Sequence, residues 1–147
     1  MVKYRPYVAA IIFRKTKSGP RFLLLHRKQN WKGWEYIKGG LLPKETEISG
    51  LKREVREETG VRNIRIITEL PVQVKYIWPK TFIKDRKKWR GALQHVYVVE
   101  ILGQKIKLDR KEHSGYKWVP AKTAVKMLTH KEPKSALRYA MKRIFKL

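Results

Sequence analysis

One helical segment in the middle of the chain limits the possible folds more than any other stretch. It is expected to begin after Thr46, an N-cap residue type, and to end at Gly60, which follows the last periodic position. Ile48, Leu51 and Val55 have the spacings of three and four residues that place side chains on one helical face. The segment is therefore predicted to pack an apolar face into the core of a layered domain.

Beside that face the same segment carries three carboxylates, Glu54, Glu57 and Glu58, within about one helical turn. Like charges at this spacing destabilise a helix unless something positive lies between them. A hard divalent cation such as Mg²⁺ prefers carboxylate oxygens, so the trio is a candidate metal site. The alternative is an ordinary solvated acidic face.

The distribution of charge favours the metal site. The chain has only 12 acidic residues against 36 basic ones, and six of the acids lie within or just after residues 39–61. These six are Glu45, Glu47, Glu54, Glu57, Glu58 and Glu69. An acidic cluster in an otherwise cationic chain is better explained by a bound cation than by a solvated surface.

The net charge of +24 points to a polyanionic partner such as RNA, because basic side chains that neutralise phosphates release counterions. A highly charged solvated surface is the alternative, although the excess is far larger than solubility requires. A basic stripe in the last helical segment fits either interpretation. Its members are Lys134, Arg138, Lys142, Arg143 and Lys146.

Length and composition set the remaining limits. With 147 residues we expect one domain over residues 1–147, and 42% apolar residues argue against disorder. No apolar run approaches the ~20 residues of a membrane span and no leader segment is apparent, so we expect a cytoplasmic protein without a membrane partner. The absence of cysteine excludes a disulfide partner and a thiolate metal site.

Apolar and β-branched runs predict strands on both sides of the acidic helix and two helices at the end of the chain. A hairpin is expected through residues 17–20, and adjacent glycines at 39 and 40 predict a turn that approaches a ligand closely. This order of elements gives an α+β or α/β fold. The expected strands are residues 8–13, 22–25, 64–70, 72–78, 94–102 and 116–119, with a break near Pro71.

Residues 39–61 match every fixed position of G-x5-E-x7-R-E-U-x-E-E-x-G-U, in which U is apolar. This pattern is the Nudix box, and the chain resembles the Nudix hydrolases. The resemblance implies an α/β/α sandwich with a mixed β-sheet and hydrolysis of a nucleoside diphosphate derivative, with Mg²⁺ as the cation and Mn²⁺ as the alternative. The matching residues are Gly39, Glu45, Arg53, Glu54, Val55, Glu57, Glu58, Gly60 and Val61.

The resemblance also assigns residues to the site. It places the metal at Gly39, Glu54, Glu57 and Glu58, and counts Arg53 with the three glutamates in the catalytic set. From the residues alone, a structural role for Arg53 is preferred, as the partner of Glu45 or Glu57 that holds the helix against the preceding loop.

A second segment narrows the resemblance to one branch. Glu112, Tyr116, Lys117, Trp118 and Val119 are similar to the E-x-x-x-[YW]-[RK]-W-V segment of the enzymes that hydrolyse dinucleoside polyphosphates or remove pyrophosphate from RNA 5′ ends. In that branch the leading glutamate binds metal or acts as a base, whereas by composition Glu112 is an ordinary loop residue. The Y-R-P opening at residues 4–6 and the segment 89–97 resemble the same branch.

Departures from the branch pattern leave the substrate open between a dinucleoside polyphosphate and a 5′-polyphosphorylated RNA end. Ala92 replaces a glutamine, Val96 and Tyr97 replace Trp-Phe, and the usual proline before Lys38 is missing. A Nudix-fold RNA-binding or ribosome-associated module with little catalysis is the alternative function. The intact glutamate trio counts against it.

The substrate side is predicted to combine cations with aromatic rings. Basic charge follows a phosphate chain while aromatic faces stack bases, and residues 76–90 interleave the two kinds. Tyr76 is equally consistent with packing on the sheet, and His95 is expected to be a satisfied core histidine. The resemblance implies that Arg5, Arg27 and Lys134 contact phosphates or the first nucleotides, although each alone is consistent with a surface charge. The other predicted substrate-binding residues are Lys38, Tyr76, Trp78 and Trp89.

Overall fold

The computed structural model describes residues 3–79, 88–103 and 105–147. Within these ranges the chain forms one mixed sheet of seven strands and three helices. The elements are β1 (Tyr4–Thr16), β2 (Gly19–Arg27), β3 (Gly33–Glu35), β4 (Ile37–Gly40), α1 (Glu47–Thr59), β5 (Ile64–Ile77), β6 (Gly91–Ile101), β7 (His113–Val119), α2 (Ala121–Met127) and α3 (Lys131–Arg143).

The sheet runs in the order β3-β2-β1-β6-β5, with β4 paired to β1 and β7 paired to β2. β1 and β6 are parallel, and the other pairings are antiparallel. β1 is central because its first half pairs with β4 and its second half with β2, while its other edge pairs with β6. The ends of β2 and β4 line one cavity together with α1, and the first residue of β7, His113, contacts Glu58 of α1.

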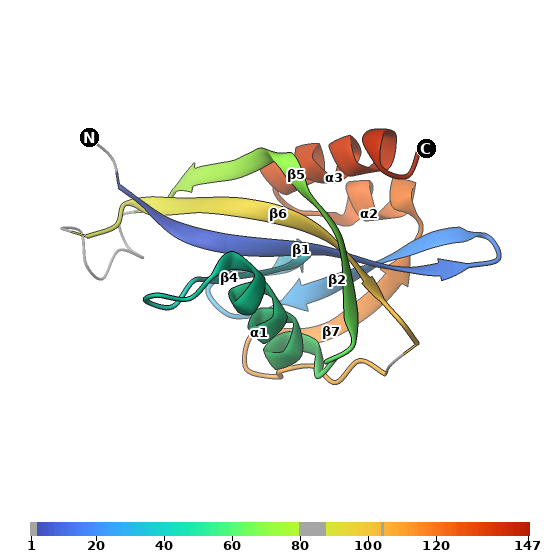
Figure 1. Ribbon diagram of the computed structural model, residues 1–147, viewed down its shortest axis with the longest axis horizontal. Coiled ribbons are helices and arrows are strands. Elements are labelled where there is room, and N and C mark those ends of the chain that lie inside the picture. The colour runs from blue at the N-terminus through green and yellow to red at the C-terminus, as the bar shows by residue number, and fades with distance from the viewer. Residues whose placement is uncertain (1–2, 80–87, 104) are drawn as a thin grey trace.

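Helices cover both faces of the sheet, with α1 on one face and α2 and α3 on the other (Figure 1). Side chains of β1 alternate between the two cores: Val8 packs with the α1 core, whereas Ala9 packs with the α2 and α3 core. Strands buried on both faces give continuous apolar runs, which is why residues 8–13 show no polar alternation. The predicted α/β/α sandwich with a mixed sheet is confirmed.

The caps of α1 are those that the sequence predicts. The Thr46 side chain accepts a hydrogen bond from the Ser49 backbone N–H, and Gly60 takes the left-handed conformation with φ of 74°. Leu51 and Val55 are buried as expected, but Ile48 is 41% exposed, so its assignment to the core face was wrong. Ile48 lies in the first turn of α1.

Two further expectations about the strands were wrong. Gly39 and Gly40 continue β4 and pair with Val8 and Tyr7, so they do not form a turn. The two expected strands 64–70 and 72–78 are one strand, β5, which ends at Ile77 and in which the register shifts between Glu69 and Gln73. Pro71 is tolerated there because β5 is an edge strand and the register break removes the ladder hydrogen bond that proline cannot donate.

Among the described residues, no helix combines the length and apolarity needed to cross a membrane.

Candidate active site

A cavity of about 1020 Å³ collects most of the residues that the sequence singles out. Its lining comes from the ends of β1, β2 and β4, from α1, from the end of β5, and from the segments before β7 and at the start of α3. Lys134 does not line this cavity, although its neighbour Pro133 does. The predicted residues that line it are Arg5, Arg27, Lys38, Gly39, Glu54, Glu57, Glu58, Tyr76, Trp78, Trp89 and Glu112.

Part of the predicted basic and aromatic run lies outside the described residues. These are Lys80, Phe82, Lys84, Arg86 and Lys87.

Arg53 ties the acidic helix to the loop that precedes it. Its Nε and one terminal nitrogen donate to the two oxygens of Glu45 at 2.7 and 2.9 Å, and that terminal nitrogen also donates to the Gly40 carbonyl at 3.1 Å. The other terminal nitrogen donates to Glu54 at 2.9 Å and to Glu57 at 3.2 Å. These contacts are those of a positioning residue, because they fix two site carboxylates against β4 and its following loop.

The three helix carboxylates differ in their surroundings. Glu54 and Glu58 are buried, whereas the side chain of Glu57 is 51% exposed. Burial raises the pKa of Glu54 to about 7, although Arg53 acts in the opposite direction. Such a carboxyl is poised between its protonated and charged forms near neutral pH, which a nearby cation would shift to the charged form.

Gly39 gives the carboxylate of Glu54 its space. A Cβ atom at position 39 would lie 2.0 Å from the carboxyl carbon and from one oxygen of Glu54. The absence of a side chain at Gly39 therefore allows the Glu54 carboxylate to lie directly against the β4 backbone.

Glu112 reaches the site from the segment before β7. Burial and the charge of Glu58 raise the pKa of Glu112, while Arg27, 4.0 Å away, opposes them. Oxygens of Glu58 and Glu112 and a ring nitrogen of His113 lie within 4.8 Å of one another. The second group of this kind among the described residues joins Glu47, Glu69 and His95.

His113 is buried between two carboxylates. Its Nε2 lies 2.7 Å from Glu35 and its Nδ1 2.9 Å from Glu58. Burial alone would lower the pKa of His113, but the two carboxylates raise it to about 9. For Glu35, burial raises the pKa, yet His113, Lys38 and Arg27 together hold it below its ordinary value.

The rim of the cavity carries the cations and rings predicted for a substrate. Lys38 donates to the Tyr76 hydroxyl at 2.7 Å, so that ring is fixed by hydrogen bonding as well as by packing. Tyr7 and Trp78 meet edge to face at 6.2 Å, with the Arg5 guanidinium 5.5 Å from the centre of the Tyr7 ring. Cationic and aromatic groups thus line the same cavity as the carboxylates.

Several lining residues were missed by the sequence interpretation. Trp31 and His130 lie with their ring centres 4.5 Å apart, and the Arg27 guanidinium is 5.7 Å from the Trp31 ring. Trp31 is separated from Arg27 by only three residues, which was the available signal. No local signal connects His130 with this site. The other missed lining residues are Tyr7, Asn30, Ile77, Pro79, Asp109, Glu132 and Pro133.

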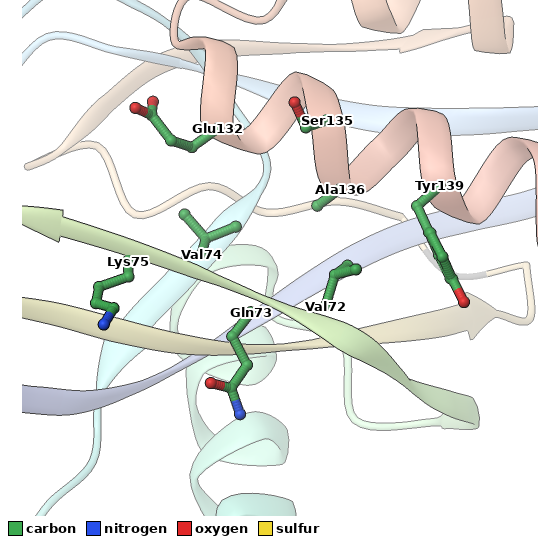
Figure 2. Close-up of a pocket in the computed structure, with 8 residues that line it drawn as sticks. All are labelled: Val72, Gln73, Val74, Lys75, Glu132, Ser135, Ala136 and Tyr139. Atoms are coloured by element: carbon green, nitrogen blue, oxygen red, sulfur yellow. The ribbon is translucent and has the colours of Figure 1, made fainter.

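A smaller hollow of about 330 Å³ lies between β5 and α3. Figure 2 shows Val72 and Val74 between the strand and the helix, with Gln73 directed away from α3. Glu132 lines both hollows. The carboxylates Glu54, Glu58 and Glu112 line only the larger cavity, so the site chemistry belongs there.

His95 lies outside both hollows. Its Nδ1 is 3.1 Å from Glu69, so it is a satisfied histidine as expected, but its side chain is 22% exposed and it does not lie in the core.

The comparison of this chain with protein families decides the class of the site. The model of the NUDIX domain matches residues 3–140. The chain belongs to the Nudix family. Members of this family are hydrolases that generally use divalent metals, and this Nudix chain is a pyrophosphohydrolase.

Two RNA pyrophosphohydrolases are similar in sequence to this chain over most of its length. An RNA pyrophosphohydrolase of Nitratiruptor sp. is 34% identical over 147 residues, with 95% of each chain covered. An RNA pyrophosphohydrolase of Campylobacter jejuni is 28% identical over 131 residues, which cover 86% of this chain and 84% of that one. The solved structure of a C. elegans Ap4A hydrolase has the same fold, with a TM-score of 0.78, 20% identity and coverage of 97% and 99%.

The residues present fit a divalent cation. Gly39 leaves the space that Glu54 occupies, and Oε2 of Glu58 is buried without a hydrogen bond of good geometry among the described residues. Oxygen donors from α1 and from the segment before β7 meet at one wall of the cavity. Such an oxygen-rich set suits a hard cation.

Proposed function

We propose that this Nudix chain hydrolyses a phosphoanhydride bond at the 5′-polyphosphorylated end of RNA, with a dinucleoside polyphosphate such as Ap4A as the second candidate substrate. The observation that carries the proposal is that carboxylates, basic side chains and aromatic rings line one cavity together. The RNA pyrophosphohydrolase relatives and the net charge of +24 favour RNA over the dinucleotide.

In this proposal Mg²⁺ is the cation, with Mn²⁺ as the alternative, held by Glu54, Glu57, Glu58 and Glu112 beside the backbone of Gly39. When bound, the cation would neutralise charge on the phosphate oxygens and lower the pKa of a coordinated water. Catalysis of this kind needs positioning and electrostatic stabilisation, and it needs no covalent nucleophile.

The rim residues bind and orient the substrate. Arg5, Arg27 and Lys38 line the wall around the carboxylates and would neutralise successive phosphates. Trp78 and Trp89 lie at the end of the cavity formed by β5 and the segment before β6, where they would stack the first bases. Lys134, outside the cavity lining, would contact only RNA that extends along α3.

Glu112 is proposed as the proton acceptor. Water attacks phosphorus, its proton passes to the Glu112 carboxylate, and the bond from phosphorus to the bridging oxygen breaks, which releases the leaving phosphate. Burial and the charge of Glu58 raise the pKa of Glu112, which makes its carboxylate a stronger proton acceptor than a solvated one. Arg53 acts through Glu54 and Glu57 and does not touch the substrate.

The test is hydrolysis of triphosphate-ended RNA and of diadenosine tetraphosphate, side by side, with Mg²⁺ or Mn²⁺. We expect faster turnover of the RNA and loss of both activities in Glu57→Gln, which changes an exposed carboxylate and leaves the fold intact. Turnover of neither substrate, with RNA binding retained, would instead support a binding module. Unchanged turnover in Glu57→Gln would refute the metal assignment.

A further inference from the structure

Glu35 and His113 form a buried pair behind the cavity wall. Glu35 is 6% exposed and His113 is 2% exposed, and neither lines the cavity. The Nε2 atom of His113 lies 2.7 Å from Oε2 of Glu35. The other ring nitrogen, Nδ1, lies 2.9 Å from Oε2 of Glu58, which does line the cavity.

The sheet fixes both members of the pair. Glu35 ends β3 and is paired with Leu25, while His113 begins β7 and is paired with Arg27. β2 therefore lies between them in the sheet and sets their separation. Both ring nitrogens of His113 lie beside carboxylate oxygens, and Nδ1 is the one that contacts the cavity residue Glu58.

Glu35 also connects to the rim. Arg27 donates to Oε2 of Glu35 at 3.1 Å, and Lys38 lies 3.9 Å from its other oxygen. The contacts form a continuous chain from Arg27 through Glu35 and His113 to Glu58. A buried carboxylate that served only for packing would be better replaced by an apolar side chain, because its desolvation is costly.

We propose that Glu35 and His113 are positioning residues that orient the Glu58 carboxylate toward the cation and couple it to Arg27 on the substrate rim. Oε2 of Glu58 lies 2.9 Å from Nδ1 of His113, an ion-pair contact through which the imidazole holds this carboxylate at the cavity wall. Groups that hydrogen-bond a metal ligand from behind fix its orientation, and their loss weakens metal affinity by about 10- to 100-fold. This inference rests on the proposed role of Glu58 as a metal ligand.

The experiment measures Mn²⁺ affinity by electron paramagnetic resonance in the absence of substrate, on the whole chain and three variants. Glu35→Gln and His113→Phe are each expected to weaken Mn²⁺ binding about 10- to 100-fold. Turnover should fall at low metal and recover at saturating metal. The double variant should bind Mn²⁺ no more weakly than His113→Phe alone, because Glu35 acts through His113.

Glu100→Gln is the matched control. Glu100 is as buried as Glu35, at 3% exposure, but its ion pairs join Arg65 and Lys15 away from the cavity. We expect it to lower the melting temperature and to leave Mn²⁺ affinity unchanged. Should His113→Phe fail to fold, the nearly isosteric Glu35→Gln still decides the question by its Mn²⁺ affinity.

The outcomes separate this inference from the proposed function. Variants that melt earlier but bind Mn²⁺ like the parent would overturn the positioning role and leave the hydrolase assignment intact. Additive losses in the double variant would overturn the coupling of Glu35 to His113. A parent that binds Mn²⁺ in this variant-dependent way, yet hydrolyses neither substrate, would overturn the proposed function alone, and a parent that binds no Mn²⁺ would overturn both.

Discussion

At the residue scale, two glutamates that contact the same arginine are driven in opposite directions. Glu45 receives two hydrogen bonds from Arg53, and these hold its pKa down at about 2. Glu54 receives one and is deeply buried, so its pKa rises to about 7. Glu45 is therefore suited to a structural ion pair. Glu54 is suited to be a metal ligand, because a bound cation would favour its charged form.

The Glu45 and Arg53 pair predicts a specific loss of stability in acid. Because the folded pKa of Glu45 lies below its unfolded value of 4.5, its contribution is fully present above about pH 5 and is lost as pH falls toward 2. Glu45→Gln should therefore be less stable than the parent by a constant amount from pH 5 to pH 7. Urea unfolding from pH 7 down to pH 2 should show that the difference in stability between parent and variant shrinks below pH 4. A difference that stays constant down to pH 2 would contradict the assignment.

Gly39→Ala is predicted to remove activity while leaving the fold in place. The added Cβ would meet the flexible end of the Glu54 side chain, which can swing away at little cost in stability. A displaced catalytic group lowers the rate on the order of 100-fold. Gly115→Ala in β7 is the control, because a Cβ there meets nothing within 4 Å. Turnover and melting temperature are measured for both variants. Equal turnover of the two would refute the role of Gly39 in leaving space for the Glu54 carboxylate.

At the element scale, α1 contributes residues both to the core and to the site. Leu51 and Val55 pack one face of α1 against the sheet. Glu54 and Glu58 lie beside that face and line the cavity. The orientation of the carboxylates thus follows from how α1 packs. Weakening the helix should affect both the core and the site.

Removal of the N-cap tests that link. Thr46→Ala deletes the acceptor for the Ser49 backbone N–H and should destabilise the protein by about 1 kcal/mol. Thr46→Ser keeps a hydroxyl at the same position and should retain most of the stability. Chemical denaturation of both variants gives the comparison, and equal stabilities of the alanine and serine variants would mean that the cap contributes nothing.

At the scale of the whole molecule, the dominant property is a net charge of +24. Three carboxylates of α1, those of Glu54, Glu57 and Glu58, line the cavity, and basic residues outnumber acidic ones by 36 to 12 in the whole chain. A short phosphate chain engages the rim cations, whereas a longer polyanion engages the surface beyond them. The two candidate substrates should therefore respond differently to salt.

RNA binding is predicted to weaken steeply with salt. Each phosphate neutralised on a single strand contributes about 0.7 to the slope of log affinity against log salt, so about five contacts correspond to roughly a 100-fold loss between 50 and 200 mM. Diadenosine tetraphosphate, with fewer phosphates, should give a shallower slope. Binding titrations at several salt concentrations provide the comparison, and equal slopes would argue against RNA contacts outside the cavity.

The sequence by itself determined the features that depend on local chemistry. The limits of α1 follow from Thr46 and Gly60, whose cap geometries need only neighbouring backbone groups. The Nudix box likewise lies within 23 consecutive residues, so its spacing could be recognised before any folding was known. Continuous apolar runs also indicated the central strands, because burial on both sheet faces leaves no polar alternation.

Tertiary structure alone decided which distant residues meet. The continuity of β5 through Pro71 depends on its edge position and a register break, and Ile48 is left outside the core that buries Leu51 and Val55. The approach of Glu35 to His113 needs β2 between β3 and β7, across 78 residues of sequence. Such contacts arise from strand order and register, which are set by the packing of the whole sheet and leave no periodic trace in the chain.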